Sequence, residues 1–327
     1  MSETEDFQLP EWARLIDAGM PRERYLAATA AGEVTVHTHG GQVTSWRCHG
    51  RERLWLSTTA EYAADKAIRG GIPVIYPWFG GGPDGQRKPA HGPARLAQWE
   101  LAGWGFDYDD DPEAVDLEFA LGERNPRGSS GLDGVAGAEG WPPGTRADLQ
   151  ARTGRDSLRV VLTLFNYTEE PVRCEAALHT YLAVSDVEAI TIERLDGVSY
   201  HDKVAGRDAV QSGAIPFGEE IDRIYATSEP VILRDNDHAL RVGSEGATHT
   251  VVWNPGREKG PTMADVSDWR GFVCIEAAAI GPGALTIPPR ILRDAGRDLP
   301  GFVQLVQELT VLVTSERAAR PRPEPTR

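Results

Sequence analysis

Short runs in which apolar and polar residues alternate recur along the whole chain. In the clearest run, Leu158, Val160, Leu162 and Leu164 fall on one face, while Arg159 falls on the other. Alternation with a period of two is typical of β-strands, and Gly, Pro, Asn or Asp bound these runs. Further runs lie at 114–120, 189–195, 248–253, 271–277 and 309–313. Many short strands with turns between them favour an all-β sandwich or barrel over a parallel α/β sheet.

Helical periodicity is weak and is confined to residues 11–18 and 60–67. The segment 122–144 holds seven glycines and three prolines. We expect it to form a long surface loop that buries little and is mobile, because it has few large apolar residues. It could link two domains. A loop within a single domain is the preferred interpretation, because predicted strands flank the segment on both sides without a change in composition.

The charge and the cysteines exclude several classes of protein. A formal net charge of −15 opposes non-specific binding to nucleic acid and to anionic membrane surfaces. Three cysteines without a CxxC pair indicate buried, reduced thiols and disfavour a cysteine zinc site. The acidic N-terminal residues do not resemble a signal peptide, and no apolar run is long enough to span a bilayer. We therefore expect a cytoplasmic protein.

One stretch of this acidic chain is basic. Between Lys66 and Gln98 the only acidic residue is Asp84, against five basic ones: Lys66, Arg69, Arg87, Lys88 and Arg95. Two guanidinium groups can hold a phosphate or carboxylate through paired, charge-assisted hydrogen bonds. The alternative is an ordinary solvated loop, and from this stretch alone the two interpretations have similar weight.

Two ionisable residues interrupt apolar, strand-like runs. His179 lies in AALHTYLAV and Glu276 in FVCIEAAAI, where an unpaired charge is costly to bury. Alternation places Val273 and Ile275 on one face and Glu276 on the other, from which it could project into a pocket. Glu276 could instead be a structural carboxylate paired with an arginine or facing water. His179 could be a core histidine bonded to the backbone.

No motif for a nucleotide loop, a nucleophile elbow or a zinc protease occurs in the chain. His37 and His39 would be neighbours on one face of a strand. A metal there would need further ligands, so surface histidines are the preferred interpretation and no metal site is predicted.

Seven motifs, taken together and in this order, resemble the hexose-6-phosphate mutarotases, or glucose-6-phosphate 1-epimerases, of the aldose 1-epimerase superfamily. The motifs are RGGIPVIYPWFG (69–80), HGPARLAQWEL (91–101), LHTYLAVSD (178–186), DKV (202–204), DRIY (222–225), VVWNPG (251–256) and FVCIEAA (272–278). The resemblance implies an antiparallel β-supersandwich of the galactose mutarotase type. It implies one catalytic domain at 30–317, after an extension at 1–29 and before a disordered tail at 318–327.

The resemblance also implies an activity and a set of site residues. Mutarotation opens a pyranose ring and recloses it with the other configuration at C1, which needs proton transfer at O1 and at the ring oxygen but no cofactor. Glu276 would be the base on O1–H, and His179 the acid on O5, with its proton favoured by a nearby carboxylate. The substrate-binding residues would include Arg69 and Arg95 on a 6-phosphate. His91 would assist at the ring or bond a sugar hydroxyl, and Asp222 would hold a hydroxyl or orient His179.

The expected partner is therefore a small sugar phosphate, bound by a monomer that needs neither nucleic acid nor membrane. Two alternatives stay open. An aldose 1-epimerase of free sugars would have no use for the basic cluster. A carbohydrate-binding sandwich without catalysis would have no use for the pair of His179 and Glu276, although a fold alone does not prove an activity.

Overall fold

The structure, a computed structural model, describes residues 8–30, 32–123, 129–292 and 298–312. Within these residues every pairing between named strands is antiparallel, and the all-β prediction is confirmed. Each predicted run contains or overlaps a strand, although in the run 189–195 only Thr191–Glu193 is a strand. The face of Leu158, Val160, Leu162 and Leu164 packs into the main hydrophobic core.

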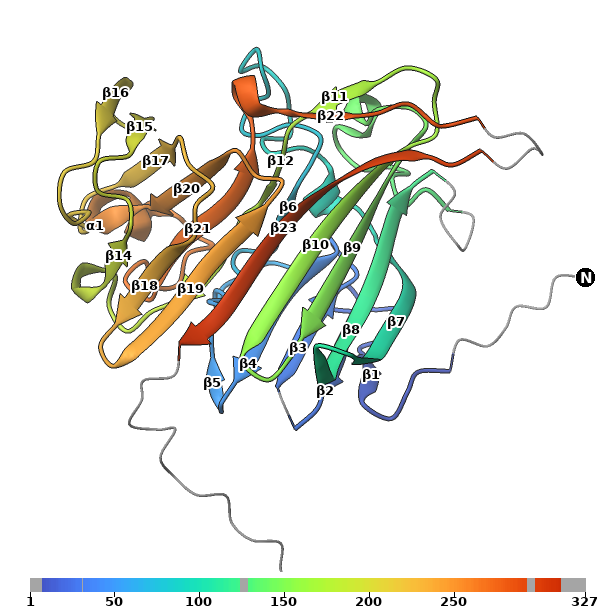
Figure 1. Cartoon of the computed structure of the whole chain (residues 1–327), viewed down its shortest axis with the longest axis horizontal. Helices are drawn as coiled ribbons and strands as arrows, with labels where there is room; N and C mark the ends of the chain where they lie inside the picture. Colours follow the sequence, from blue (N-terminus) through green and yellow to red (C-terminus); the bar gives the residue numbers. More distant parts are fainter. Residues whose placement is uncertain (1–7, 31, 124–128, 293–297, 313–327) are drawn as a thin grey trace, which may run out of the picture.

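A long, eight-stranded sheet faces the viewer in Figure 1. Its strands, in spatial order, are β14 (Thr191–Glu193), β18 (Val231–Asp235), β19 (His238–Glu245), β23 (Gly301–Leu312), β10 (Ser157–Asn166), β9 (Thr145–Thr153), β8 (Asp111–Gly122) and β7 (Glu100–Tyr108).

Three further sheets complete the structure. The second eight-stranded sheet contains β16 (Arg207–Val210), β15 (Ser199–Asp202), β17 (Ile221–Tyr225), β20 (His249–Asn254), β21 (Phe272–Ala279), β12 (Ala176–Leu178) and β6 (Val74–Ile75), with β13 (Tyr181–Ala183) also paired to β21. A five-stranded sheet contains β1 (Ala13–Ile16), β2 (Arg24–Ala28), β3 (Glu33–His37), β4 (Gln42–Cys48) and β5 (Arg51–Glu52). A small sheet pairs β11 (Val172–Cys174) with β22 (Leu285–Ile287).

Helix is scarce in the described part of the chain. It comprises α1 (Gly256–Lys259) and the short 3-10 helices η1 (Ala94–Leu96), η2 (Ala138–Gly140), η3 (Val187–Ala189), η4 (Gly260–Thr262) and η5 (Gly281–Gly283). None of these is long and apolar enough to cross a bilayer.

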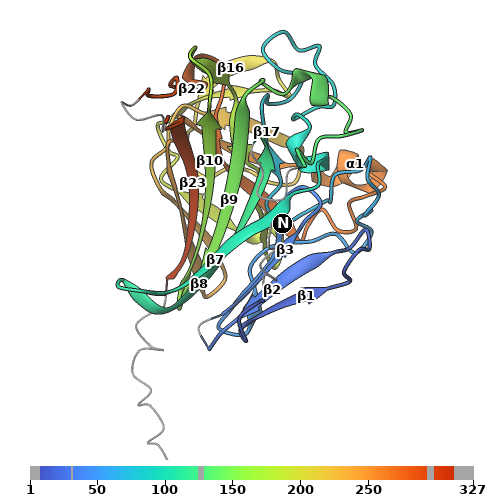
Figure 2. The same cartoon turned by 90° about the vertical axis from the view of Figure 1, so that its right-hand side faces the viewer.

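The sheets pack in layers. β12 and β21 of the second sheet contact β23 of the long sheet, and β3 of the five-stranded sheet contacts β9. Figure 2 shows β1, β2 and β3 in a layer apart from β9, β10 and β23. Val273 and Ile275 of β21 point into the main core between the sheets, as alternation predicted. The opposite face of β21, which carries Glu276, is turned away from the long sheet.

Two sequence predictions are wrong. Residues 11–18 and 60–67 do not form helices; the first contains β1, and the second forms turns. The glycine-rich segment 122–144 buries more than expected, because Trp141 is buried and its ring packs edge-on against Tyr76 at 4.7 Å. Residues 124–128 of that segment lie outside the described residues, so its expected mobility stays a prediction.

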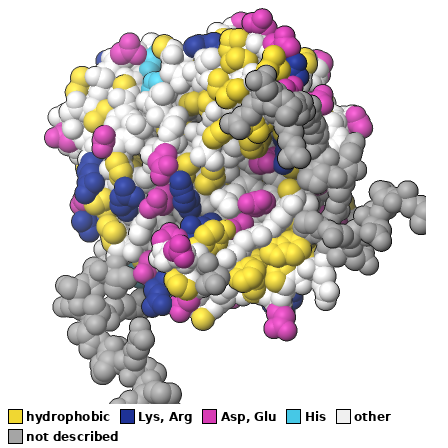
Figure 3. Space-filling model, turned by 45° about the vertical axis from the view of Figure 1, so that its right-hand side comes forward, with side chains coloured by type: hydrophobic (Ala, Val, Ile, Leu, Met, Phe, Trp, Pro, Cys, Tyr) yellow, Lys and Arg dark blue, Asp and Glu magenta, His cyan; other side chains and the backbone are white. Residues whose placement is uncertain are grey.

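The domain boundaries at residues 29 and 317 also stay a prediction. Strands β1 and β2 come from the first 29 residues and pair, through β2, with β3. The expected disordered tail lies outside the described residues. On the face shown in Figure 3, acidic and basic side chains are interspersed with apolar ones.

Candidate active site

His179 and Glu276 face each other across neighbouring strands. β12 and β13 both pair with β21 and keep the same register, with Leu178 opposite Ala277 and Tyr181 opposite Cys274. The two residues between β12 and β13 therefore stand opposite Glu276 and Ile275. The His179 Nε2 atom lies 3.3 Å from Glu276 Oε1, and the two side chains are 12% and 1% exposed. Sheet register thus brings together two residues that are far apart in the sequence.

This pair answers the alternatives that the sequence left open for Glu276. Glu276 is neither an exposed edge residue nor the partner of an arginine among the described residues, since its ion-pair partner is His179. The His179 Nδ1 and Glu276 Oε2 atoms are buried without a hydrogen-bond partner in the described part of the chain. Buried polar atoms normally have partners, so these two are free to meet a polar ligand.

Burial controls the protonation of the pair. It raises the pKa of Glu276 well above its usual value, and the charge of Asp222 adds to the rise. Burial also lowers the pKa of His179 to about 3, with the positive charges of Arg69 and Arg95 adding to the fall. The sequence-based expectation that a carboxylate would favour protonated His179 is therefore wrong in direction. Desolvation and the cations outweigh it, and both shifts favour the neutral forms.

Arg69 is joined to the pair through an aromatic ring. Its Nη1 atom donates to the Tyr181 hydroxyl at 2.9 Å, and the Tyr181 ring stacks on His179 with 4.9 Å between ring centroids. The Nε and Nη2 atoms of Arg69 lie 2.9 and 2.8 Å from Asp265 Oδ2. Arg69 is therefore held in place before any ligand binds.

Arg95 is the less satisfied of the two arginines. Its Nη2 atom donates to the Ala90 carbonyl at 2.7 Å, while its buried Nε has no partner among the described residues. Burial lowers its pKa to about 10, so it keeps its charge at neutral pH. Arg69 is one of the charges that act on it, which places both arginines in one electrostatic environment.

His91 also reaches the pair. Its ring lies edge-on to His179 at 5.8 Å and to Phe79 at 4.8 Å. The Gly80 N–H donates to His91 Nδ1 at 3.2 Å, and burial lowers the pKa of His91 well below its usual value. A neutral ring that accepts at Nδ1 carries its proton on Nε2, so His91 can donate one hydrogen bond.

Asp222 lies on β17, and β20 separates this strand from β21. Asp222 is on the same face of the second sheet as Cys274 and Glu276 of β21. A cross-strand row runs Asp222, Trp253, Cys274, Tyr181. Lys203, directly after β15, forms an ion pair with Asp222 at 2.8 Å. Lys203 is also among the charges that act on His179 and Glu276. Sequence reasoning assigned no role to Lys203, Tyr181 or Asp265; only the DKV and LHTYLAVSD motifs contained the first two.

The rest of the basic stretch lies elsewhere. Arg87 stacks over the Trp78 ring at 5.3 Å, and together with Lys88 it lines a pocket of about 400 Å³. That pocket contains none of the six predicted site residues. The structure thus brings together only Arg69 and Arg95 from the predicted cluster.

The two N-terminal histidines were misplaced by the sequence analysis. His37 and His39 are buried, at 3% and 6% exposure, rather than on the surface. The His39 Nε2 atom bonds the Lys66 carbonyl at 2.7 Å. All three cysteines are free and buried, as predicted.

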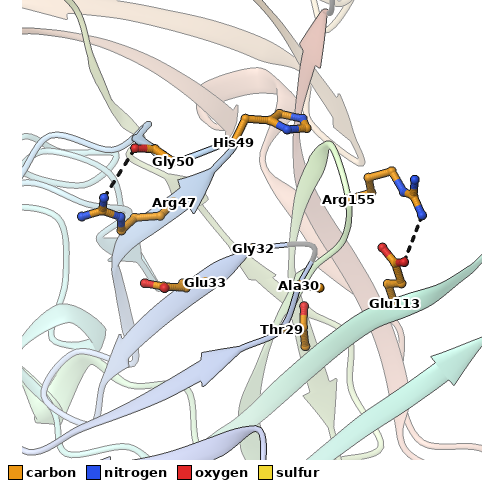
Figure 4. A pocket seen from close by; sticks show the side chains of 9 residues that line it. All are labelled: Thr29, Ala30, Gly32, Glu33, Arg47, His49, Gly50, Glu113 and Arg155. Carbon is orange, nitrogen blue, oxygen red and sulfur yellow. Dashed lines mark hydrogen bonds and ion pairs between the residues drawn. The ribbon is translucent and has the colours of Figure 1, made fainter. Parts of the chain in front are cut away.

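A second pocket, of about 510 Å³, lies beside the turn between β4 and β5 and is lined by His49 and Arg155 (Figure 4). Nearby, Cys48, His49 and Asp156 offer three atoms close enough to hold a metal ion. Burial raises the pKa of Cys48 to about 11, which opposes the thiolate form that binds metals. This region contains none of the predicted site residues.

The layered, antiparallel β-sandwich that carries this pair has a galactose mutarotase-like fold. Two solved structures share the fold. A "putative mutarotase (YeaD)" from Salmonella typhimurium has a TM-score of 0.72 and 23% identity, and the match covers 91% of this chain and 96% of that one. A galactose mutarotase-like protein from Clostridium acetobutylicum has a TM-score of 0.64 and 11% identity, covering 93% and 99%.

Sequence comparison gives the family. The aldose 1-epimerase family model matches residues 24–289. Several relatives carry the name "Putative glucose-6-phosphate 1-epimerase", among them the following two. The one from Cenchrus ciliaris is 30% identical, covering 75% of this chain and 74% of its own length. The one from Escherichia coli K12 is 31% identical, covering 73% and 77%. The chain belongs to the aldose 1-epimerase family, and interconversion of sugar anomers is the activity that this membership supports.

Proposed function

We propose that this protein interconverts the α and β anomers of a hexose 6-phosphate, with glucose 6-phosphate as the preferred substrate. The observation that carries the proposal is the presence of two arginines beside the acid–base pair. Arg69 donates to the hydroxyl of the tyrosine whose ring stacks on His179, and the buried Nε–H of Arg95 has no partner among the described residues. The names of the two relatives point to the same substrate.

The pair can perform both proton transfers. O1 and O5 are bonded to the same carbon, so two groups 3.3 Å apart can reach both oxygens from one face. The Glu276 carboxyl first passes its proton to His179, which gives a carboxylate and an imidazolium. Glu276 then takes the O1 proton while His179 protonates O5, and the C1–O5 bond breaks. Rotation about C1–C2 and the reverse transfers close the ring with the other configuration. Protons balance, and these steps need no redox or nucleotide cofactor.

A bound phosphate would favour the charged form of the pair, in which His179 is an imidazolium and Glu276 a carboxylate. The positive charges of Arg69 and Arg95 are among the causes of the low pKa of His179. A phosphate dianion bound between these arginines would offset them and so favour the imidazolium form that donates to O5. His91 and Asp222 would hold sugar hydroxyls, the first as a donor and the second as an acceptor.

One observation favours the alternative of a free-sugar epimerase. Arg69 already has an anionic partner in Asp265, so a phosphate must share or displace that ion pair. The unpaired N–H of Arg95 has no such competitor in the described residues, and on this ground the sugar phosphate is the preferred substrate. We further propose that the protein works as a monomer in the cytoplasm, where its three buried cysteines stay reduced.

NMR exchange spectroscopy tests the proposal. Cross-peaks between the anomers of glucose 6-phosphate should grow faster with enzyme than without it, and faster than those of glucose or galactose. Faster exchange of a free sugar than of glucose 6-phosphate would favour the alternative.

A further inference from the structure

A glutamine of the long sheet reaches into the sheet that carries the pair. Gln307 belongs to β23, which runs between β19 and β10 (Figure 1), and it is 2% exposed. Its Oε1 atom accepts from the Ala277 N–H at 2.9 Å and from the Thr180 hydroxyl at 3.2 Å. Ala277 follows Glu276, and Thr180 follows His179. One side chain therefore bonds both strands at the positions next to the pair.

The backbone at His179 departs from a regular strand. The Thr180 N–H donates to the Leu178 carbonyl at 3.0 Å, which makes a tight turn centred on His179. The His179 N–H donates outward to Pro73, and the Ile275 N–H still donates to Thr180 across the ladder. The turn lies between β12 and β13 and separates their pairings with β21. Both strands keep the same register on β21.

Gln307 gives an acceptor to a donor on each side of the pair. Leu178 stands opposite Ala277 in the register, its carbonyl also accepts from the Thr180 N–H, and the Ala277 N–H donates to Gln307 as well. Loss of Gln307 would remove one buried acceptor from both Ala277 and Thr180, which is unfavourable and would loosen the turn.

Glutamine suits this position because it both accepts and donates. Its Nε2 atom donates to the Gly243 carbonyl of β19 at 3.1 Å. Because the Ala277 N–H can only donate and the Gly243 carbonyl can only accept, the amide has one orientation that satisfies both. The side chain is thus fixed by two sheets at once.

We propose that Gln307 is a positioning residue for catalysis, which holds the turn at His179 and so sets the contact between His179 and Glu276. This inference rests on the catalytic roles proposed above. A shift of about 1 Å in a catalytic group can cost about 100-fold in rate, so loss of this bridge acts on kcat and leaves substrate binding nearly unchanged.

The test compares Gln307→Leu with Leu149→Ala in anomerisation of the preferred substrate. Leu149 lies in the core on β9 and is 1% exposed, so its truncation matches the loss of stability without touching β21. We expect Gln307→Leu to lower kcat about 10- to 100-fold with KM within about twofold. Leu149→Ala should lower the melting temperature and keep kcat. The pH dependence of kcat should shift in Gln307→Leu alone, because only there does the His179–Glu276 contact change.

Thr180 gives a second route if Gln307→Leu does not fold. Thr180→Val removes one of the two donors to Gln307 and should lower kcat several-fold, while Thr180→Ser keeps the hydroxyl and should recover most of that loss. The role of Gln307 would be overturned if Gln307→Leu and Thr180→Val both kept the parental kcat. If His179→Ala and Glu276→Gln were inactive in the same assay, the proposed catalytic roles would still stand. Full activity in His179→Ala and Glu276→Gln would overturn the proposed catalytic roles and this inference with them.

Discussion

The hydroxyl of Tyr181 accepts a hydrogen bond from Arg69, while the ring of the same tyrosine stacks on His179. One residue thus connects the proposed phosphate-binding arginine to the proposed acid. Replacing Tyr181 by Phe keeps the ring and removes the hydroxyl. Because a hydrogen bond to a charged group contributes about 1.5–3 kcal/mol, we expect KM for glucose 6-phosphate to rise about tenfold or more, with a much smaller change in kcat. Steady-state kinetics would show this split; a fall in kcat with unchanged KM would contradict it.

The catalytic pair makes the next prediction. Glu276→Gln and His179→Ala should each lower kcat by about 10²–10⁴-fold, the usual contribution of a general acid or base. Circular dichroism should show the same β-sheet content as the parent. An active Glu276→Gln protein would show that the carboxylate takes no proton from the sugar.

The arginines should act mainly on the binding of the phosphorylated sugar. Arg69→Ala and Arg95→Ala should each weaken the binding of glucose 6-phosphate about tenfold to a hundredfold, because each removes a charge-assisted bond. Turnover of free glucose should not fall, because removing either cation relieves part of the low pKa of His179. Lysine should not restore full affinity at either position, since it lacks the bidentate fork. Arg87→Ala, in the separate pocket, is the matched control and should bind like the parent. Calorimetric titration measures each affinity, and parental binding in both arginine variants would exclude the phosphate assignment.

His37 predicts how stability depends on pH. Burial, reinforced by the charge of Arg24, lowers the pKa of His37 to about 3. Its unfolded value is about 6.5, so between these values the unfolded state binds the additional proton. Stability from this group is therefore present above pH ~6.5 and is lost as the pH falls toward 3. The melting temperature of His37→Gln should fall less steeply on acidification than that of the parent. Leu149→Ala, which removes no titratable group, is the control and should lower the melting temperature without changing the slope.

Alternation predicted the strands well because a period of two is a local property. The face of β10 and the orientation of Glu276 on β21 both followed from it. The weak helical pattern at 11–18 failed because β1 gains its hydrogen bonds from β2, a tertiary effect that outweighs local propensity.

The site could be predicted in composition but not in electrostatics. The motifs contained His179, Glu276, Arg69, Arg95, His91 and Asp222, and in the structure ring contacts, ion pairs or charge effects connect each of them to this set, while their roles stay predictions. The ion pairs of Lys203 with Asp222 and of Asp265 with Arg69 depend on sheet register and loop packing, which a single sequence does not contain. The low pKa of His179 likewise comes from burial and from cations distant in sequence.

Anomer exchange of glucose 6-phosphate, measured by NMR with the parent, Glu276→Gln and Arg95→Ala proteins, tests the central claim most directly. The parent should accelerate exchange of glucose 6-phosphate more than that of glucose. Glu276→Gln should accelerate neither, and Arg95→Ala should lose the preference for the phosphorylated sugar while it still turns over glucose. Equal exchange of glucose 6-phosphate by the parent and by Glu276→Gln would contradict the account.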